Sequence, residues 1–281
     1  MTYVRSPRGA RAGFLREGRV VDAWDALERD PHAGPGVRDL LPHLRELDHG
    51  QWAIPYDETR PLDEVLLETP VPDSEKIICI GLNYRSHAEE AGIEPPSVPT
   101  FFAKFRNALV PSGAIVTLPK GSAKVDYEAE VAFVVGRHCS NVSVDEALDH
   151  VAGYMLFNDL SARDLQFATP QWMPGKVFDG SAPCGPALVT PDEAGPHDQI
   201  EFELTLNGDV MQSASTADLI FSVPQLVAHL STLMTLKPGD IVSTGTPSGV
   251  GSTRQPRVWL RAGDEIAISS QTLGRLETTI R

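Results

Sequence analysis

From residue 76 to its end, the sequence is a succession of short apolar runs that are separated by Gly, Pro and Asn. Runs of this length and punctuation predict β-strands. They do not alternate with helical segments, so a regular strand–helix–strand fold is not expected. The sequence predicts a mostly β fold with some α (α+β), in which a few helices cover the sheets. The clearest strands are KIICIGLN, DYEAEVAFVVG, HVAGYMLFND, IEFELTLNGDVM, DIVSTG, EIAISS and LETTI.

Two segments in this region carry helix signals. SVPQLVAHLSTLMTL has apolar residues at helical spacing, begins at Ser222 and ends before a turn at 237–240. Before ALDH, Ser143 and Glu146 have the spacing of a capping box.

The first 70 residues have a different texture and predict a small N-terminal α+β domain. AGFLREGRVVDAW predicts two short strands around a polar turn at 16–18. DLLPHLRELDHG has leucines at helical spacing, with Pro42 tolerable in the first turn and Gly50 as a stop. Pro- and acid-rich segments follow, so we place the boundary near residue 70 and the second domain at 71–281.

Composition limits the possible partners. The chain has 281 residues, 41% hydrophobic and 22% charged, as is typical of a globular protein. A net charge of −14 without a Lys/Arg cluster argues against nucleic acid or an anionic membrane as partner, but not against a small anionic substrate. Neither a signal-peptide core nor a membrane-spanning run is found, so we expect a cytoplasmic protein. Three widely spaced cysteines predict buried thiols in a reducing compartment: Cys79, Cys139 and Cys184.

The stretch VDYEAEVAF alternates acidic and apolar residues, which places Asp126, Glu128 and Glu130 on one face of a strand. Like charges in a row raise one another's pKa unless a cation relieves them. Another acid, Asp159, follows the apolar run 151–157. Two strand glutamates and a strand-end aspartate supply hard oxygen ligands suited to Mg²⁺ or Mn²⁺. A solvated strand face is the alternative, and the pattern leaves both open.

Several weaker patterns lie near these acids in sequence. Tyr84, His87 and Glu90 follow one another at steps of three, so a short helix would place His87 against Glu90 as a general base; an incidental exposed pair is the alternative. Ser161 can cap a helix on which Arg163 and Gln166 face the same way.

Two further segments could contact an anion. The Gly-rich turn TGTPSGVG, residues 244–251, offers backbone N–H groups and two Thr hydroxyls to an oxyanion, although a plain tight turn is the commoner reading. Lys176 in GKVFDG could bind a carboxylate or enolate oxygen if it is partly buried, but most lysines lie at the surface.

Read in order, six segments resemble the fumarylacetoacetate hydrolase family over about residues 76–281, and within it the bacterial acylpyruvase and 2-hydroxyhepta-2,4-diene-1,7-dioate isomerase-like branch. The N-terminal module also resembles that of many bacterial members. The resemblance implies a mixed β-sheet roll capped by short helices, usually dimeric, with the metal at its centre. The six segments are GLNYRSHAEEAG, FFAKF, DYEAEVAFVVG, GYMLFNDLSARDLQ, GKVFDGSAPCGP and LKPGDIVSTGTPSGVG.

The resemblance also implies roles for particular residues. It assigns the divalent metal to Glu128, Glu130 and Asp159, and leaves out Asp126 although that residue shares their face. Lys104 matches a motif position too, whereas Phe105 and Pro174 stand where other residues are usual, so the pocket wall and the substrate are not fixed. The remaining matches are a water-activating dyad on a mobile lid (His87 and Glu90), a lysine near the metal (Lys176) and positions that contact substrate or support the site (Arg163, Gln166 and Thr246).

The implied function is a divalent-metal-dependent hydrolase, loaded with Mg²⁺ or Mn²⁺. It would cleave a C–C bond in an acylpyruvate such as fumarylpyruvate, or in a related 2,4-dioxo acid, and release pyruvate and a carboxylic acid. Isomerisation or decarboxylation of 2-oxo or 2-hydroxydienedioate acids in aromatic catabolism, oxaloacetate included, is the first alternative. The intact pair of His87 and Glu90 favours hydrolysis. A catalytically silent protein that binds a keto acid or metal is the second alternative.

Overall fold

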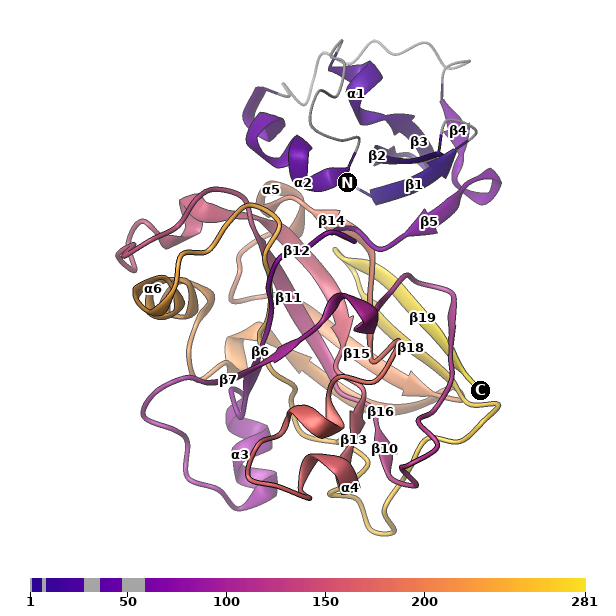
Figure 1. Ribbon diagram of the computed structural model, residues 1–281, viewed down its shortest axis with the longest axis vertical. Helices are drawn as coiled ribbons and strands as arrows, with labels where there is room; N and C mark the ends of the chain where they lie inside the picture. The colour runs from indigo at the N-terminus through magenta and orange to yellow at the C-terminus, as the bar shows by residue number, and fades with distance from the viewer. Residues whose placement is uncertain (1, 7–8, 28–35, 47–58) are drawn as a thin grey trace.

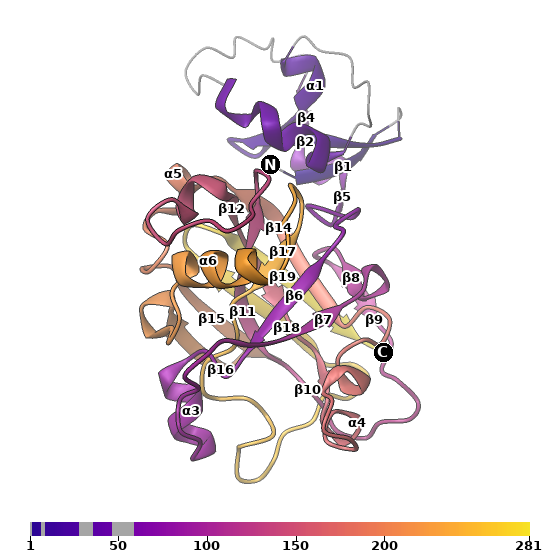
Figure 2. The same cartoon turned by 60° about the vertical axis from the view of Figure 1, so that its left-hand side comes forward.

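A computed structural model describes residues 2–6, 9–27, 36–46 and 59–281. A small N-terminal unit lies at one end of a larger body of strands, and helices α3 and α4 lie at the other end (Figures 1 and 2). The prediction of a mostly β protein with few helices is confirmed. No helix in these ranges is long and apolar enough to cross a membrane.

The N-terminal unit is built on a five-stranded sheet in the order β4-β3-β2-β1-β5. The predicted strand pair around the turn at 17–18 is β2 and β3. The predicted helix at 39–50 is only partly present, as a short α-helix that continues into a 3₁₀ turn; its last predicted residues lie outside the described ranges. The domain boundary near residue 70 stays a prediction. The elements are β1 (Thr2–Ser6), β2 (Gly9–Arg16), β3 (Arg19–Asp22), α1 (Ala23–Ala26), α2 (Val37–Leu40), η1 (Leu41–Glu46), β4 (Arg60–Pro61), η3 (Leu62–Glu64) and β5 (Leu66–Glu68).

The larger body contains a seven-stranded sheet in the order β7-β6-β17-β11-β12-β14-β8. It is mixed, because β6 and β17 run parallel whereas β11 and β12 run antiparallel. A two-stranded sheet, β10 with β13, lies beside it. The strands are β6 (Ile77–Gly81), β7 (Thr100–Lys104), β8 (Leu109–Val110), β10 (Val125–Asp126), β11 (Ala129–Val135), β12 (Val151–Asn158), β13 (Ser161–Ala162), β14 (Ala182–Val189) and β17 (Ile241–Ser243).

A five-stranded sheet in the order β16-β15-β18-β19-β9 completes the body. The run IEFELTLNGDVM forms a hairpin and not one strand, because Asn207 and Gly208 adopt positive φ and turn the chain. Its strands are β9 (Ala114–Val116), β15 (Glu201–Leu206), β16 (Asp209–Ser215), β18 (Glu265–Ser270) and β19 (Gly274–Ile280).

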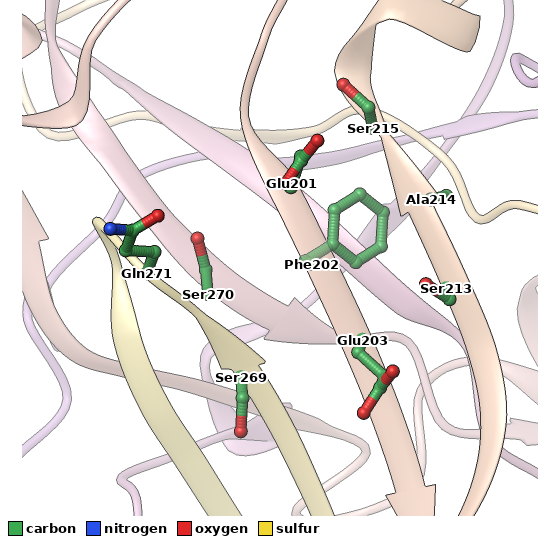
Figure 3. Close-up of a pocket in the computed structure, with 9 residues that line it drawn as sticks. All are labelled: Glu201, Phe202, Glu203, Ser213, Ala214, Ser215, Ser269, Ser270 and Gln271. Atoms are coloured by element: carbon green, nitrogen blue, oxygen red, sulfur yellow. The ribbon is translucent and has the colours of Figure 1, made fainter.

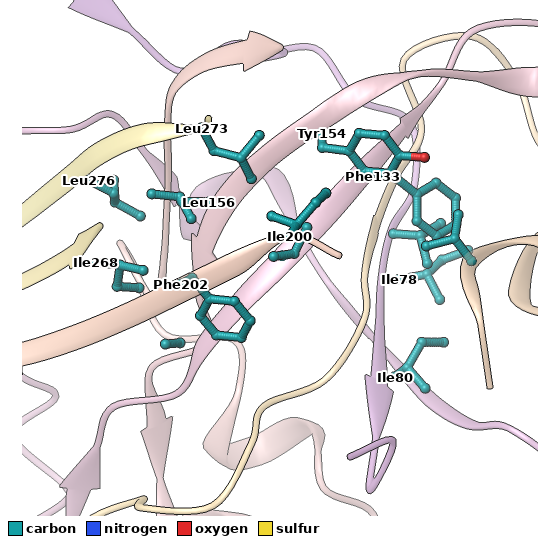
Figure 4. Packing of buried hydrophobic residues seen from close by; sticks show 14 of the residues in the cluster. Ile78, Ile80, Phe133, Tyr154, Leu156, Ile200, Phe202, Ile268, Leu273 and Leu276 are labelled. Atoms are coloured by element: carbon teal, nitrogen blue, oxygen red, sulfur yellow. The ribbon is translucent and has the colours of Figure 1, made fainter. Parts of the chain in front are cut away.

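The main core lies between the two large sheets, where Phe133 and Leu156 of one pack in the same cluster as Phe202 and Ile268 of the other (Figure 4). The opposite face of β11 and β12 is also covered, because a second apolar cluster joins Met155 to residues of the N-terminal unit. Both strands are therefore buried along their whole length, which explains their near-continuous apolar sequence.

The helices of the body are short. Helix α6 (Val223–Leu233) begins after Ser222 as predicted, and the N–H of Ser222 donates to Gln225 Oε1 at 2.9 Å. ALDH forms a 3₁₀ helix, η5 (Ala147–His150), preceded by a 2.7 Å hydrogen bond from Ser143 Oγ to Glu146 Oε2. The others are α3 (Arg85–Ala91), η4 (Arg106–Ala108), α4 (Arg163–Gln166), η6 (Met173–Gly175), α5 (Pro191–Ala194) and η7 (Thr216–Asp218). All three cysteines are free and buried, as predicted.

Candidate metal centre

Three carboxylates meet where β11 begins and β12 ends. Glu128, Glu130 and Asp159 each offer an oxygen within 4.8 Å of the others. The strand register explains this: Ala129 pairs with Asn158, so Glu128 lies opposite Asp159, and Glu130 follows two residues later on the same face. The three residues are 5%, 2% and 1% exposed. The alternative of a solvated strand face is therefore wrong.

The predicted strand 125–133 is interrupted, and this interruption separates the fourth acid from the other three. β10 ends at Asp126 and β11 starts at Ala129. The Asp126 carboxylate accepts hydrogen bonds from Arg163 Nε at 2.9 Å and from the backbone N–H groups of Gly251 and Ser252 at 2.7 and 3.0 Å. Asp126 therefore has a charged partner and, with the N–H of Tyr127 at 3.0 Å, three amide donors of its own.

Buried cations face the carboxylates. Lys176 Nζ lies between two of them, 2.6 Å from Glu128 Oε2 and 2.7 Å from Asp159 Oδ2. Arg163 Nη2 lies 2.7 Å from the other oxygen of Glu128. Lys104 Nζ lies 2.7 Å from Asp159 Oδ1 and donates to the backbone oxygens of Lys176 and Ser181. Neither lysine is a surface residue, since both are 2% exposed.

The pKa values of the two glutamates are shifted in opposite directions. Burial opposes the charge of Glu128, but Arg163 and Lys176 outweigh burial and lower its pKa. Burial also opposes the charge of Glu130, and there the neighbouring charges of Asp159 and Glu128 add to it and raise its pKa. Burial would lower the pKa of Lys176, but the carboxylates of Asp159 and Glu128 reverse this and raise it.

The donor set fits a hard divalent cation. One oxygen of Glu130, Oε2, accepts hydrogen bonds from Ser243 Oγ and from Gly245 N at 3.1 Å. Among the described residues, Asp159 Oδ1 is buried and receives no hydrogen bond, despite the nearby Lys104. Buried carboxylate oxygens that are left without hydrogen bonds are costly unless a cation satisfies them. Three clustered carboxylates, one of which has such an oxygen, suit Mg²⁺ or Mn²⁺.

Helix α4 presents Arg163 and Gln166 together, as their spacing predicts, with a 3.0 Å hydrogen bond from Arg163 Nη1 to Gln166 Oε1. The predicted cap at Ser161 is wrong, because α4 has Ala162 at its N-cap without a side-chain hydrogen bond. Ser161 Oγ lies instead 2.7 Å from the backbone oxygen of Asp159 and 3.1 Å from Glu128 Oε2, within β13.

Helix α3 carries the candidate dyad. His87 Nδ1 lies 3.4 Å from Glu90 Oε2, and the other oxygen of Glu90 accepts a 3.0 Å hydrogen bond from Gly249 N. Tyr84 does not extend this row, because it caps the helix, is fully buried and packs edge-on against Phe202. His87 therefore has one ring nitrogen directed to a carboxylate, which leaves the other for a substrate or water.

The Gly-rich turn at 244–251 binds the protein's own carboxylates. Its N–H groups donate to Glu130 from Gly245, to Glu90 from Gly249 and to Asp126 from Gly251. The hydroxyl of Thr246 donates to the backbone oxygen of Ala129 at 2.9 Å, and Thr244 does the same to Val131. The N–H groups that were expected to bind an external oxyanion thus hold the protein's own carboxylates, and the two Thr hydroxyls bind backbone oxygens of β11.

Gln212 in β16 supports the same turn and is a residue that the sequence patterns did not reveal. Its Oε1 accepts from Ala129 N at 2.9 Å, and its Nε2 donates to Thr246 Oγ1 at 2.9 Å and to Pro247 O at 3.0 Å. The alternation of a half-exposed strand predicts only the inward direction of such a residue, not its partners 34 and 83 positions away.

A cavity of about 190 Å³ opens onto the carboxylates. It is smaller than the usual pocket for a drug-sized ligand, so it suits a small one. Every residue predicted for the site lines this cavity except Glu90, which reaches it through His87. The predicted residues that line it are His87, Glu128, Glu130, Asp159, Arg163, Gln166, Lys176 and Thr246.

A second hollow of about 430 Å³ lies on the outer sheet and is lined by a face of β15, β16 and β18 (Figure 3). Its charged residues are Glu201 and Glu203, and no cation is among the side chains that line it. It has neither a described group of metal-ligating side chains nor a paired acid and base, so the smaller cavity is the candidate site.

Fold and site together define an α+β protein with a buried cluster of three carboxylates that could hold a metal ion. The chain belongs to the fumarylacetoacetate hydrolase family, because the family model described as "Fumarylacetoacetate (FAA) hydrolase C-terminal" matches residues 76–281. It is 42% identical to the fumarylacetoacetate hydrolase domain-containing protein 2 homolog of Dictyostelium discoideum, over the whole chain and 96% of that protein. It is also 42% identical to the oxaloacetate tautomerase YisK of Bacillus subtilis, over 86% of this chain and 82% of that one.

Among solved structures, the chain resembles maleylpyruvate hydrolase from Sphingobium sp. SYK-6 in complex with manganese(II) and pyruvate. The TM-score is 0.80 at 29% identity, over 100% of this chain and 98% of that one. The predicted family is thus confirmed, and its members are enzymes. The similarity is not specific to the predicted acylpyruvase and dienedioate isomerase branch, since a tautomerase is among the relatives.

Proposed function

We propose that this chain is a divalent-metal-dependent enzyme that cleaves a C–C bond in a small acylpyruvate-like 2,4-dioxo acid by hydrolysis. The observation that carries the proposal is the placement of His87, backed by Glu90, in the same cavity as the three carboxylates. A carboxylate behind an imidazole orients the ring and stabilises its protonated form, as a base that activates water requires.

The charges of the cluster favour an anionic substrate. Four buried carboxylates (Asp126, Glu128, Glu130 and Asp159) meet three buried cations (Lys104, Arg163 and Lys176), so the fully ionised cluster carries one negative charge. A bound divalent ion would turn this into one positive charge. A 2-oxo carboxylate could then enter the cavity despite the net charge of −14 of the whole chain.

Glu128, Glu130 and Asp159 would hold the ion, and it would supply Lewis-acid polarisation of the substrate's 2-oxo and carboxylate oxygens. Lys176, fixed between Glu128 and Asp159, adds a positive charge where an enolate oxygen develops. His87 would take the proton from the attacking water and return it to the leaving carbon. Arg163 is not a free substrate ligand, because its donors already hold Asp126, Glu128 and Gln166.

Keto–enol tautomerisation of an oxaloacetate-like acid is a second candidate. The 42% identity to an oxaloacetate tautomerase favours it, and so does the small cavity. This reaction needs a proton shuttle, which His87 could provide, and no attacking water. We also propose that the protein is cytoplasmic, forms a homodimer and binds Mg²⁺ or Mn²⁺.

A product analysis tests the proposal. The protein with Mg²⁺ or Mn²⁺ is offered acetylpyruvate, fumarylpyruvate, oxaloacetate and a 2-hydroxydienedioate in isotope-labelled water, with EDTA controls. Pyruvate plus a labelled carboxylic acid, lost with EDTA, is the expected result. If the enol absorbance of oxaloacetate changes and no labelled acid forms, the protein is a tautomerase and the hydrolase proposal is wrong.

Variants then separate the roles. Glu128→Ala should lose activity and metal binding together, whereas His87→Ala should lose hydrolysis and keep metal binding. Full activity in Glu128→Ala would refute the metal assignment. If the wild-type protein is inactive but still binds metal and 2-oxo acids, it is a catalytically silent binding protein.

A further inference from the structure

The cavity has two ends of different chemistry. At its floor lie the carboxylates and Lys176, all 5% exposed or less. At its mouth lie Phe167, 67% exposed, and Ile93, 47% exposed. Apolar side chains in the lining of a pocket offer contact area to an apolar group of a ligand.

An aromatic wall leads away from the floor. Lys176 Nζ lies 4.8 Å from the ring centroid of Phe102, and the Phe102 ring meets Trp172 edge-on at 6.1 Å. Trp172 in turn packs on the backbone of Gly81, where an added Cβ would lie 2.5 Å from its ring. A ligand anchored beside Lys176 would therefore extend along Phe102 and Trp172, which line the cavity together with Phe167.

The mouth offers no cation to a second carboxylate. Of the residues that line the cavity, the cationic or titratable bases are His87, Arg163 and Lys176. Arg163 and Lys176 are held at the floor by Asp126, Glu128 and Asp159. The uncharged polar side chains of the lining are those of Gln166, Thr246, Ser252 and Thr253. A carboxylate at the mouth would thus lose water without gaining a free lysine or arginine as partner, and the one other base of the lining, His87, already faces Glu90.

We infer that the outer half of the cavity, formed by Ile93, Phe167 and Trp172, binds an apolar group of the substrate. The preferred substrate is a 2-oxo acid with an alkyl or aryl tail, and not one with a carboxylate at its far end. This inference rests on the proposed function in one respect: the 2-oxo carboxylate is placed at the three-carboxylate floor.

Binding of 2-oxo acids that cannot be cleaved tests the inference without turnover. Calorimetry with Mn²⁺-loaded protein compares pyruvate, 2-oxobutanoate, 2-oxopentanoate and 2-oxohexanoate. Affinity should rise about fourfold with each added methylene group. 2-Oxoglutarate, which replaces the terminal methyl of 2-oxopentanoate by a carboxylate, should bind more weakly than 2-oxopentanoate. Equal affinity along the series, or tighter binding of 2-oxoglutarate, would overturn the inference.

A charge placed at the mouth should reverse the preference. Phe167→Arg is expected to weaken the binding of 2-oxohexanoate by about tenfold or more and to strengthen the binding of 2-oxoglutarate. Because Phe167 is exposed, its replacement should leave folding intact. Phe105→Arg is the matched control, since Phe105 is 53% exposed and does not line the cavity. Unchanged preference in Phe167→Arg, or the same change in Phe105→Arg, would refute the role of Phe167.

The two proposals fail in different ways. Chain-length-dependent binding without any C–C cleavage would leave the apolar outer half standing and remove the hydrolase. Cleavage with a preference for dicarboxylates would keep the hydrolase and remove the apolar outer half. If no 2-oxo acid binds the metal-loaded protein, the placement of the acid at the floor is wrong and this inference falls with it.

Discussion

Asp126 accepts a 2.9 Å hydrogen bond from Nε of Arg163, and both side chains are buried. Arg163 Nη2 also lies 2.7 Å from Glu128 Oε1, so the guanidinium joins Asp126 to a metal-ligand candidate. Asp126 in turn holds the N–H groups of Gly251 and Ser252. The acid that does not take part in the three-carboxylate set thus fixes both the Gly-rich turn and the orientation of Glu128.

Asp126→Asn should destabilise the protein by about 3 kcal/mol, because the variant removes one of the two carboxylates that neutralise the buried charge of Arg163. Urea unfolding at neutral pH measures this loss. Asp145→Asn is the control, since Asp145 is exposed. A loss in Asp126→Asn below about 1 kcal/mol would mean that Arg163 is satisfied by Glu128 and Gln166 alone.

Glu130→Gln should separate metal affinity from the stability of the metal-free protein. Burial and the like charges of Asp159 and Glu128 already oppose ionisation of Glu130, so the neutral side chain should leave the metal-free stability unchanged or increase it. The affinity for the metal should fall by more than about 100-fold. Residues that only support a metal ligand contribute about 10- to 100-fold, and loss of a ligand itself should cost more.

Thermal unfolding with and without Mn²⁺ measures both quantities. Wild type should gain about 2.7 kcal/mol when the ion is at 100 times its dissociation constant, and Glu130→Gln should gain little at the same concentration. Glu94→Gln is the control, because Glu94 is exposed. Equal stabilisation of the variant and wild type by Mn²⁺ would remove Glu130 from the ligand set.

The sequence allowed the prediction of those elements that local patterns specify. Alternation placed Glu128 and Glu130 on one face, and strand length placed Asp159 at the end of β12. Alternation alone could not separate Asp126 from them, because the break at residues 127–128 depends on pairing with β13, far along the chain. Gln212 was beyond local reasoning for the same physical reason, since its partners come from other strands.

Gln212→Met tests how far this residue holds the Gly-rich turn. Methionine keeps a similar shape but leaves the N–H of Ala129 unpaired in the core, at a cost of about 1–3 kcal/mol for each orphaned group. We expect a loss of about 3 kcal/mol in the free energy of unfolding and faster amide exchange at Gly245 and Gly249. Gln199→Met is the matched control, because Gln199 is exposed. Wild-type exchange in the turn would show that the backbone hydrogen bonds suffice.

Asp164 should give part of the stability a pH dependence. Burial opposes its charge, but hydrogen bonds from Ser122 Oγ and from Ala123 N outweigh burial and lower its pKa. A carboxyl whose folded pKa is lowered stabilises the protein fully above its unfolded pKa of about 4 and loses this effect as the pH falls through the folded value.

Asp164→Asn should therefore cost at most about 1 kcal/mol at about pH 7, because solvent screens this largely accessible group, and less at about pH 3. Urea unfolding of both proteins at the two pH values measures the difference, with Asp145→Asn again as the control. A difference that is the same at both pH values would show that Asp164 acts through neutral packing and not through its charge.

Gly81→Ala should displace the ring of Trp172, which forms part of the aromatic wall of the cavity. An added Cβ would lie 2.5 Å from the Cζ3 atom of Trp172, so the ring must shift, at a cost of about 1–3 kcal/mol. Because Trp172 packs edge-on against Phe102, we expect altered tryptophan fluorescence and weaker binding of 2-oxohexanoate, with metal affinity retained. Gly121→Ala is the control, since a Cβ there meets no atom within 4 Å. Unchanged fluorescence and binding in Gly81→Ala would show that Trp172 does not form the wall against which the ligand packs.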